Sequence, residues 1–188
     1  MSKAVDRFSL KGRTALVTGA GSGMGRHFVQ TLADAGARVV CAARRKDAIE
    51  SIAAEIRGKG QQAVAVELDI GNTESVTHAF DAAEKAMGGP IDLLVNNAGQ
   101  IVFAPFPDIS DEQWTNIMNV NLMGSMRMSR EFSKRLISAG KPGSIINITS
   151  ITGQQTKPYL SIYGSAKAAL IQLTKQMAID LLPHNIRV

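Results

Sequence analysis

Tyr163 and Lys167 are the residues of this chain best suited to acid–base chemistry. They lie four residues apart, and four residues advance a helix by about 6 Å while returning to nearly the same face. The lysine ammonium would then stand beside the tyrosine phenol and stabilise its phenolate form. Such a phenol can exchange a proton with a carbonyl or alcohol oxygen. Because this spacing also recurs by chance, the neighbouring segments must decide what it means.

Two further polar residues could belong to the same site. Ser150 directly follows a predicted strand, where its hydroxyl can hold a substrate oxygen alongside the tyrosine hydroxyl. Asn121 lies inside a long amphipathic helix, where asparagine is a mediocre residue and a buried amide needs partners. Asn121 therefore either holds a water in a proton path or pins a neighbouring segment, and the residue alone favours neither.

A glycine-rich turn, Thr18–Gly25 (TGAGSGMG), lies between a predicted strand and a predicted helix. Its glycines allow a tight turn and a close approach of backbone to phosphate, and the helix N-terminus directs N–H groups at an anion. The spacing G-x-x-x-G-x-G differs from the commoner dinucleotide fingerprint, and the alternative is a merely flexible loop. We expect the turn to bind a dinucleotide pyrophosphate through Gly19, Ser22, Gly23, Met24 and Gly25.

The end of the second predicted strand bears on the choice between NAD and NADP. An acidic residue there would bind the ribose hydroxyl, but this chain has Ala43 followed by Arg44 and Arg45. Arg44 is placed for a bidentate contact with a phosphate, which predicts NADP, with NAD the less favoured alternative. Both arginines could instead be solvated at a helix start. After the third strand, Asp69, with its neighbour Ile70, could contact the adenine or simply cap a loop.

Alternating segments must position these residues. Strands are predicted at 14–18, 38–43, 63–68, 91–95 and 144–148, and a sixth begins at 186. Helices are predicted at 24–35, 47–57, 74–87 (with Asn72 or Thr73 as its cap) and 162–182. Another begins at Ser110, where Gln113 completes a capping box. This alternation predicts an α/β fold, a doubly wound parallel sheet of the Rossmann type. The carboxyl ends of the strands then bring the three suggestive segments to one rim.

Bulk composition excludes several other classes. Apolar residues make up 45% and charged residues 20%, as in an ordinary globular domain. The net charge of +5 is scattered, which disfavours nucleic-acid binding. Cys41 is the only cysteine, and the histidines lack metal-ligand spacing, so we expect neither an intrachain disulfide nor a metal. No segment is apolar over the length of a membrane span, so a cytoplasmic location is the default expectation.

Taken together, these motifs resemble the short-chain dehydrogenase/reductase family over essentially the whole chain. The motifs are Thr18–Gly25, Asp69, Asn96–Gly99 (NNAG), Asn121, Ser150 and Tyr163–Lys167 (YGSAK). In this order and spacing they are highly specific, and the 3-oxoacyl-[acyl-carrier-protein]-reductase-like branch looks most similar. The resemblance implies an oxidoreductase that passes a hydride between NADP(H) and a carbonyl or secondary alcohol, and a homodimer or homotetramer built on the helices that begin near Ser110 and Ile162.

The resemblance also implies a role for each matching residue. Tyr163 would be the general acid and base, and Lys167 would hold the nicotinamide ribose. Ser150 would orient the substrate oxygen, and Asn121 would anchor a water that links Lys167 to solvent. Asn96 would brace the sheet. The residues that would line the cofactor after the fourth strand are Asn97, Ala98 and Gly99.

The chain departs from the family pattern at its C-terminal end, at Val188. Later family segments, which cover the substrate and complete the sheet, are not in the sequence. We therefore expect residues 1–188 to form a single, C-terminally incomplete Rossmann domain that binds cofactor weakly and turns over poorly. A non-catalytic dinucleotide-binding module is the alternative function, and another Rossmann enzyme would leave the Tyr–Lys pair without a role. An apolar wall for a non-polar ketone or acyl group is suggested by Ile101, Val102, Phe103, Pro105 and Phe106.

Overall fold

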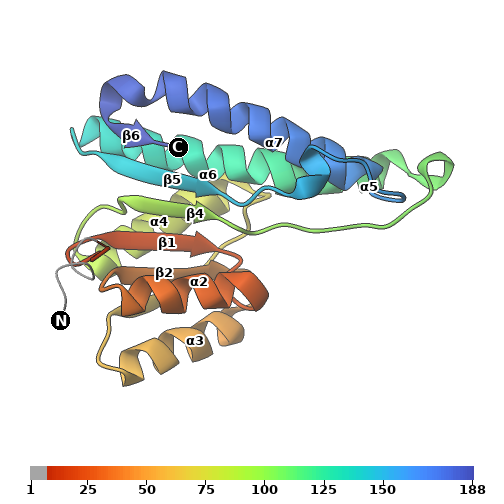
Figure 1. The fold of residues 1–188 in the computed structure, drawn as a ribbon. Helices are drawn as coiled ribbons and strands as arrows, with labels where there is room; N and C mark the ends of the chain where they lie inside the picture. Colours follow the sequence, from red (N-terminus) through yellow and green to blue (C-terminus); the bar gives the residue numbers. More distant parts are fainter. Residues whose placement is uncertain (1–7) are drawn as a thin grey trace.

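The computed structural model describes residues 8–188 and contains one parallel sheet. Its strands run in the order β3-β2-β1-β4-β5-β6 (Figure 1), and every neighbouring pair is parallel. The strands are β1 (Thr14–Thr18), β2 (Arg38–Ala43), β3 (Ala63–Glu67), β4 (Leu93–Asn96), β5 (Gly143–Asn147) and β6 (Ile186–Arg187). The order reverses between β1 and β4, which confirms the predicted doubly wound Rossmann sheet.

Helices connect successive strands. They are α2 (Gly23–Asp34), α3 (Lys46–Gly58), α4 (Thr73–Met87), α5 (Asp111–Met118), α6 (Ser125–Ser138) and α7 (Ser161–Asp180). Short turns are η1 (Phe106–Asp108), η2 (Asn119–Gly124), η3 (Ile151–Gly153) and η4 (Leu182–His184). Within residues 8–188, none of the helices combines the length and apolar character that crossing a bilayer requires.

Each face of the sheet carries its own apolar core. Helices α2 and α3 cover one face and bury Val29 and Ile49 against β1 and β2 (Figure 1). Helices α4 and α6 cover the other face and bury Phe80 and Phe132. Over β1 and β2 both faces are covered, and these strands are nearly continuous buried runs, as central parallel strands must be. Cys41 lies fully buried in the first of these cores.

Polar caps set several helix starts where the sequence predicts them. The Ser110 hydroxyl accepts from the Gln113 backbone N–H, and the Gln113 side chain accepts from the Ser110 N–H, both at 3.1 Å. The Asn72 side chain accepts from the Ser75 N–H at 3.0 Å and begins α4. These contacts confirm the capping box and one of the two caps considered for α4.

Several boundaries differ from the sequence prediction by one residue, and three differences are larger. The helix that begins after Ser110 is not α-helical throughout, because the π-helical turn η2 separates α5 from α6. Helix α7 ends at Asp180 rather than Leu182, since Pro183 disfavours α geometry at the residue before it. Strand β4 begins two residues later than predicted, at Leu93, where the ladder with β1 and β5 starts.

Candidate active site

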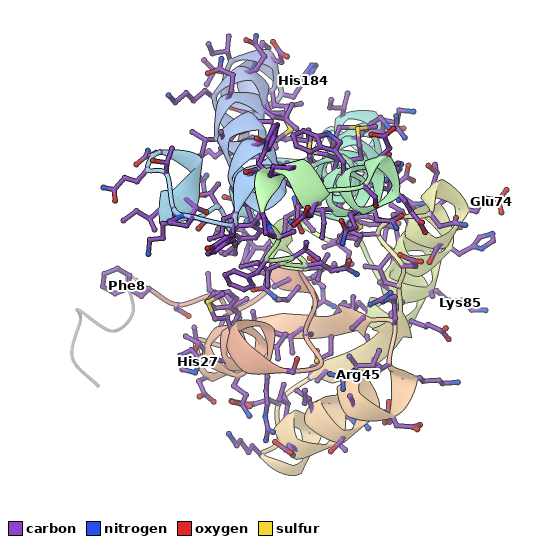
Figure 2. The ribbon with its side chains drawn as sticks, turned by 90° about the vertical axis from the view of Figure 1, so that its right-hand side faces the viewer. Phe8, His27, Arg45, Glu74, Lys85 and His184 are labelled. Atoms are coloured by element: carbon purple, nitrogen blue, oxygen red, sulfur yellow. The ribbon has the colours of Figure 1, made fainter. Side chains whose placement is uncertain are left out.

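The loops that follow β1, β4 and β5 meet at one edge of the sheet. Parallel strands place all their carboxyl ends on this edge, and Figure 2 looks onto it. The glycine turn after β1 contacts the Asn97 segment after β4, while the segment after β5 contacts α7. Residues distant in sequence are thus gathered around one rim.

The glycine turn is closed by direct backbone packing. Gly19 has a φ of +68°, the left-handed region that favours glycine, and a Cβ there would lie 2.9 Å from the Ala98 Cα. A Cβ on Gly25 would lie 2.2 Å from the Gly19 carbonyl oxygen. At Gly23, where α2 begins, no atom lies within 4 Å of the Cβ position, so the backbone there is open to a ligand.

Thr18 ties the glycine turn to the loop after β4. Its Oγ1 accepts hydrogen bonds from the backbone N–H groups of Asn97 and Ala98, at 3.0 and 2.9 Å. In return, the Asn97 side chain donates from Nδ2 to the Thr18 carbonyl at 2.9 Å. These bonds fix the two loops relative to each other. They also occupy both backbone N–H groups, so these are not available to a ligand.

A cleft of about 580 Å³ opens between these loops and the ends of β2 and β3. Its walls are formed by Gly19, Gly21, Ser22, Met24, Gly25, Ala42, Ala43, Arg44, Arg45, Leu68, Asp69, Ile70, Asn97, Ala98, Gly99, Gln100 and Val120. Most residues predicted to bind a cofactor therefore line one cavity. The exceptions are Gly23, which lies at the open start of α2, and the pair Tyr163 and Lys167.

Several wall residues lie outside the set predicted from the sequence. Gly21 lies inside the recognised turn, and Gln100 and Val120 are chain neighbours of Gly99 and Asn121, which were assigned. Adjacency to a motif was thus a usable signal for these three. Leu68 also adjoins an assigned residue, Asp69, but its own sequence pattern is that of an ordinary apolar strand residue.

The part of the cleft at the end of β2 is basic. Arg44 and Arg45 are both exposed and both line the cleft (Arg45 is labelled in Figure 2). The carboxylate of Asp69, which follows the neighbouring strand β3, accepts from the Gly71 N–H at 2.9 Å. Asp69 therefore organises its own turn, as the cap alternative predicts, while also lining the cleft.

Asn121 lies in the π-helical turn η2 and is fully buried. Its Oδ1 accepts from the Gln100 backbone N–H, and its Nδ2 donates to the Gln100 carbonyl, both at 2.7 Å. The side chain thus satisfies the backbone of a loop residue much as a neighbouring strand would. Of the two roles that the sequence left open, pinning a neighbouring segment is the one these bonds perform, and the water role stays a prediction.

Lys167 is the one charged side chain among the fully described residues that is almost completely buried, at 4% exposure. Its Nζ donates to the Ile148 carbonyl at 2.7 Å and lies 5.7 Å from the centre of the Tyr163 ring. Burial lowers the pKa of the Lys167 ammonium below its ordinary value. A Cβ on Gly99 would lie 3.8 Å from Nζ, so the loop after β4 also reaches this amine.

Ser150 begins the short turn η3, which lies directly on α7. The Ser150 Oγ accepts from the Thr152 backbone N–H at 3.2 Å and from the Thr152 hydroxyl at 2.8 Å. A Cβ on Gly153 would lie 2.9 Å from the Lys167 carbonyl carbon, and one on Gly164 would lie 3.0 Å from the Thr152 carbonyl oxygen. Two glycines thus let η3 approach α7 and bring Ser150 to the helix that carries Tyr163. No local feature of the sequence predicts this contact.

Asn96 links the sheet to α6. Its Nδ2 donates to the Asn147 Oδ1 at 2.8 Å and to the Ser129 hydroxyl at 3.0 Å. The side chain is 2% exposed, so it acts inside the core and not in the cleft. This geometry agrees with the bracing role that the family resemblance implied. Among the described residues, no group of three or more histidine, cysteine or acidic side chains could hold a metal ion.

Comparison with known proteins extends this picture. The family model described as short chain dehydrogenase matches residues 13–188. "Carbonyl reductase [NADPH] 2" of Sus scrofa is 40% identical over 184 residues, which are 97% of this chain and 71% of the relative. "L-xylulose reductase" of Homo sapiens is 41% identical over 181 residues, covering 95% of this chain and 70% of the relative.

The fold and the family model agree with a solved structure. The crystal structure of a gluconate 5-dehydrogenase from Burkholderia cenocepacia J2315, in complex with NADP and tartrate, superposes with a TM-score of 0.91 at 36% identity. The match covers 97% of this chain and 71% of that one. With a family model that spans nearly the whole chain and relatives at about 40% identity, the chain belongs to the short-chain dehydrogenase/reductase family of oxidoreductases.

Proposed function

We propose that this protein is an NADP(H)-dependent oxidoreductase that interconverts a small carbonyl compound and its alcohol, with Tyr163 as the general acid and base. The observation that carries the proposal is the buried ammonium of Lys167, which is held on the Ile148 carbonyl and lies 5.7 Å from the Tyr163 ring centre. A buried charge with so few partners is costly, and such groups gather at functional sites.

The donor set of the cleft fits a phosphorylated dinucleotide. The open backbone at Gly23 and the start of α2 provide room and N–H groups for a pyrophosphate. Arg44 and Arg45 provide charge-assisted donors for a further phosphate, and no acidic residue ends β2. We propose that Arg44 holds the 2′-phosphate and that Asn97, Ala98 and Gly99 line the rest of the path.

NADPH, when bound, supplies the hydride for reduction of the carbonyl carbon. On the protein side, the Tyr163 hydroxyl would donate its proton to the carbonyl oxygen as charge develops there. The Lys167 ammonium, close to the ring, would favour the phenolate that remains. The Ser150 hydroxyl would hold the same oxygen in place as a second hydrogen-bond donor. Proton return to Tyr163 through Lys167, Asn121 and a bound water is the remaining part of the proposal.

The relatives support the choice of cofactor and the substrate class. One is named for NADPH and another was solved with NADP, which agrees with the basic end of β2. Their names refer to a carbonyl compound, a ketose and a sugar acid. We therefore propose a small ketone as the substrate, and the exposed Ile101, Phe103 and Phe106 after β4 would favour one with an apolar end.

The assembly proposed is a homodimer or homotetramer. Helix α5 packs against α7, and Trp114 and Met123 nearby are 37% and 40% exposed. Exposed large apolar residues on a helix pair are typical of subunit interfaces. A cytoplasmic location and a single dinucleotide-binding domain complete the proposal.

The test compares Tyr163→Phe with the unsubstituted protein. We expect the rate of NADPH consumption with a panel of ketones, L-xylulose included, to fall about 10²- to 10⁴-fold, while NADPH binding stays within a few-fold. Tyr159→Phe is the matched control, because it removes a phenol from an exposed tyrosine of the same segment. Equal rates for Tyr163→Phe and the unsubstituted protein on every ketone would favour a non-catalytic dinucleotide-binding module.

A further inference from the structure

A series of hydrogen-bonded polar side chains runs from the sheet to α7. The Asn96 Nδ2 donates to the Asn147 Oδ1 at 2.8 Å, and the Asn147 Nδ2 donates to the Thr174 hydroxyl at 2.9 Å. The Thr174 hydroxyl then donates to the Leu170 carbonyl at 2.7 Å, one turn earlier in α7. Asn147 and Thr174 each accept one of these bonds and donate the next, so the bonds polarise in one direction and reinforce one another.

This series of hydrogen bonds ends beside the lysine of the candidate active site. Asn147 immediately precedes Ile148, whose carbonyl accepts a hydrogen bond from the Lys167 ammonium. Thr174 lies seven residues after Lys167, which is two turns or about 10 Å further along the same face of α7. Helix α7 is therefore attached to the end of β5 at two positions along its axis, once through Thr174 and once through Lys167.

The second half of α7 is less deeply buried than the first, and its apolar residues Leu173 and Met177 are half-buried. The buried residues of this helix are Ile162, Ala166, Lys167 and Leu170, all in its first half. Among the side-chain hydrogen bonds of residues 171–180, the one from Asn147 to Thr174 alone reaches the sheet. The bond from Asn147 is thus a directional contact between this half of the helix and the end of β5.

We propose that Asn147 and Thr174 form a positioning clamp that fixes the position of α7 along its axis and its rotation about it. Lys167 is then held where it can donate to the Ile148 carbonyl beside Tyr163. Neither clamp residue touches a reacting group, and both act through Lys167. The proposal rests on the proposed function, because the clamp matters to turnover only if Lys167 and Tyr163 do. A displacement of about 1 Å at such a site can reduce turnover about 10²-fold.

Thr174→Val tests the clamp, because it keeps the branched shape and removes the hydroxyl. Thr174→Ser restores the hydroxyl. Thr77→Val is the matched control, because the Thr77 hydroxyl makes the same bond one turn back, to the Thr73 carbonyl at 3.3 Å, and this bond in α4 is solvent-exposed and has no link to the sheet. The first readout needs no cofactor: acetylation of Lys167 by acetic anhydride, followed by peptide mass spectrometry. Thiol labelling of the buried Cys41 reports general opening of the fold in the same sample.

We expect Thr174→Val to raise the acetylation rate of Lys167 about tenfold through local opening of α7, with Cys41 labelling unchanged. Thr174→Ser and Thr77→Val should both match the unsubstituted protein. On a ketone that the Tyr163→Phe comparison identifies, kcat of Thr174→Val should fall about 10- to 100-fold, with KM within about twofold. Lys167 acetylation that stays constant, or rises only in step with Cys41 labelling, would overturn the clamp. Loss of the Tyr163 effect would overturn the proposed function and leave the acetylation result standing.

Discussion

Gly25→Ala tests the packing that closes the glycine turn. The added methyl would lie 2.2 Å from the Gly19 carbonyl oxygen and 2.7 Å from the Asn97 Nδ2. Carbon and oxygen do not tolerate this distance, so the start of α2 must move away from the turn by about 1 Å. The contacted oxygen belongs to the backbone, so no flexible side chain can absorb the displacement.

The expected loss of stability follows from this overlap. Overpacking of a well-packed site costs about 1–3 kcal/mol, and each kcal/mol lowers the unfolding midpoint of a domain of this size by about 2–4 °C. We therefore expect Gly25→Ala to unfold about 2–12 °C below the unsubstituted protein in a thermal scan followed by circular dichroism. NADPH binding, measured by the fluorescence of the nucleotide, should weaken in parallel, because the displaced turn is the proposed pyrophosphate site.

Two other glycines serve as controls. Gly58 ends α3 and has no atom within 4 Å of its Cβ position, so Gly58→Ala should be neutral or stabilising by up to about 1 kcal/mol. Gly23 has equal space but a φ of +52°, so Gly23→Ala measures backbone strain without overlap. If Gly25→Ala unfolded within a degree of Gly58→Ala and bound NADPH equally well, the overlap at Gly19 would not govern this turn.

Three further predictions concern the remaining parts of the site. In nucleotide titrations, Arg44→Ala should raise the Kd for NADPH about tenfold or more, because a charge-assisted bond is lost, and should leave the Kd for NADH unchanged. Lys46 lies outside this cleft, so Lys46→Ala should change neither Kd. Lys167→Met should raise the unfolding free energy by about 1 kcal/mol near neutral pH, because it removes a buried ammonium. Burial places the folded-state pKa of Lys167 below the unfolded value of 10.5. At pH values between these two pKa values, the unfolded state therefore binds more protons than the folded state. Stability of the unsubstituted protein therefore rises with pH through that window, and the advantage of Lys167→Met should shrink as denaturant titrations approach pH 10.5; a constant advantage would contradict the burial argument. Gly153→Ala should destabilise by about 1–3 kcal/mol in the same titrations, because its Cβ would meet the α7 backbone, and a neutral result would refute the close approach of η3.

Local chemistry made much of the fold predictable. Strand β2 was predicted with its observed bounds, because its apolar run is as long as a buried strand and is followed by charged residues. The caps at Asn72 and Ser110 follow from side chains that satisfy N–H groups three residues away. The residues lining the cleft were largely predictable because the glycine turn and the Asn97 segment lie directly after strands.

Contacts between distant segments account for what the sequence did not predict. The partner of Asn121 is the backbone of Gln100, and any residue there would offer the same two groups. The close approach of η3 to α7 depends on Gly153, which reads in sequence as a loop glycine. Thr174 reads as an ordinary helix residue, and its link to Asn147 appears only when β5 and α7 are side by side.

The π-helical turn η2 makes α5 and α6 two helices out of phase. A π turn accommodates one residue more than the α ladder does, and each residue of an α-helix turns the chain by about 100°. Deleting one residue between Asn119 and Gly124 would let the ladder run straight, but it would swing every side chain of α5 by roughly that angle relative to α6. The π turn thus changes which side of the helical segment faces the protein: α5 packs against α7, while α6 packs against β4 and β5.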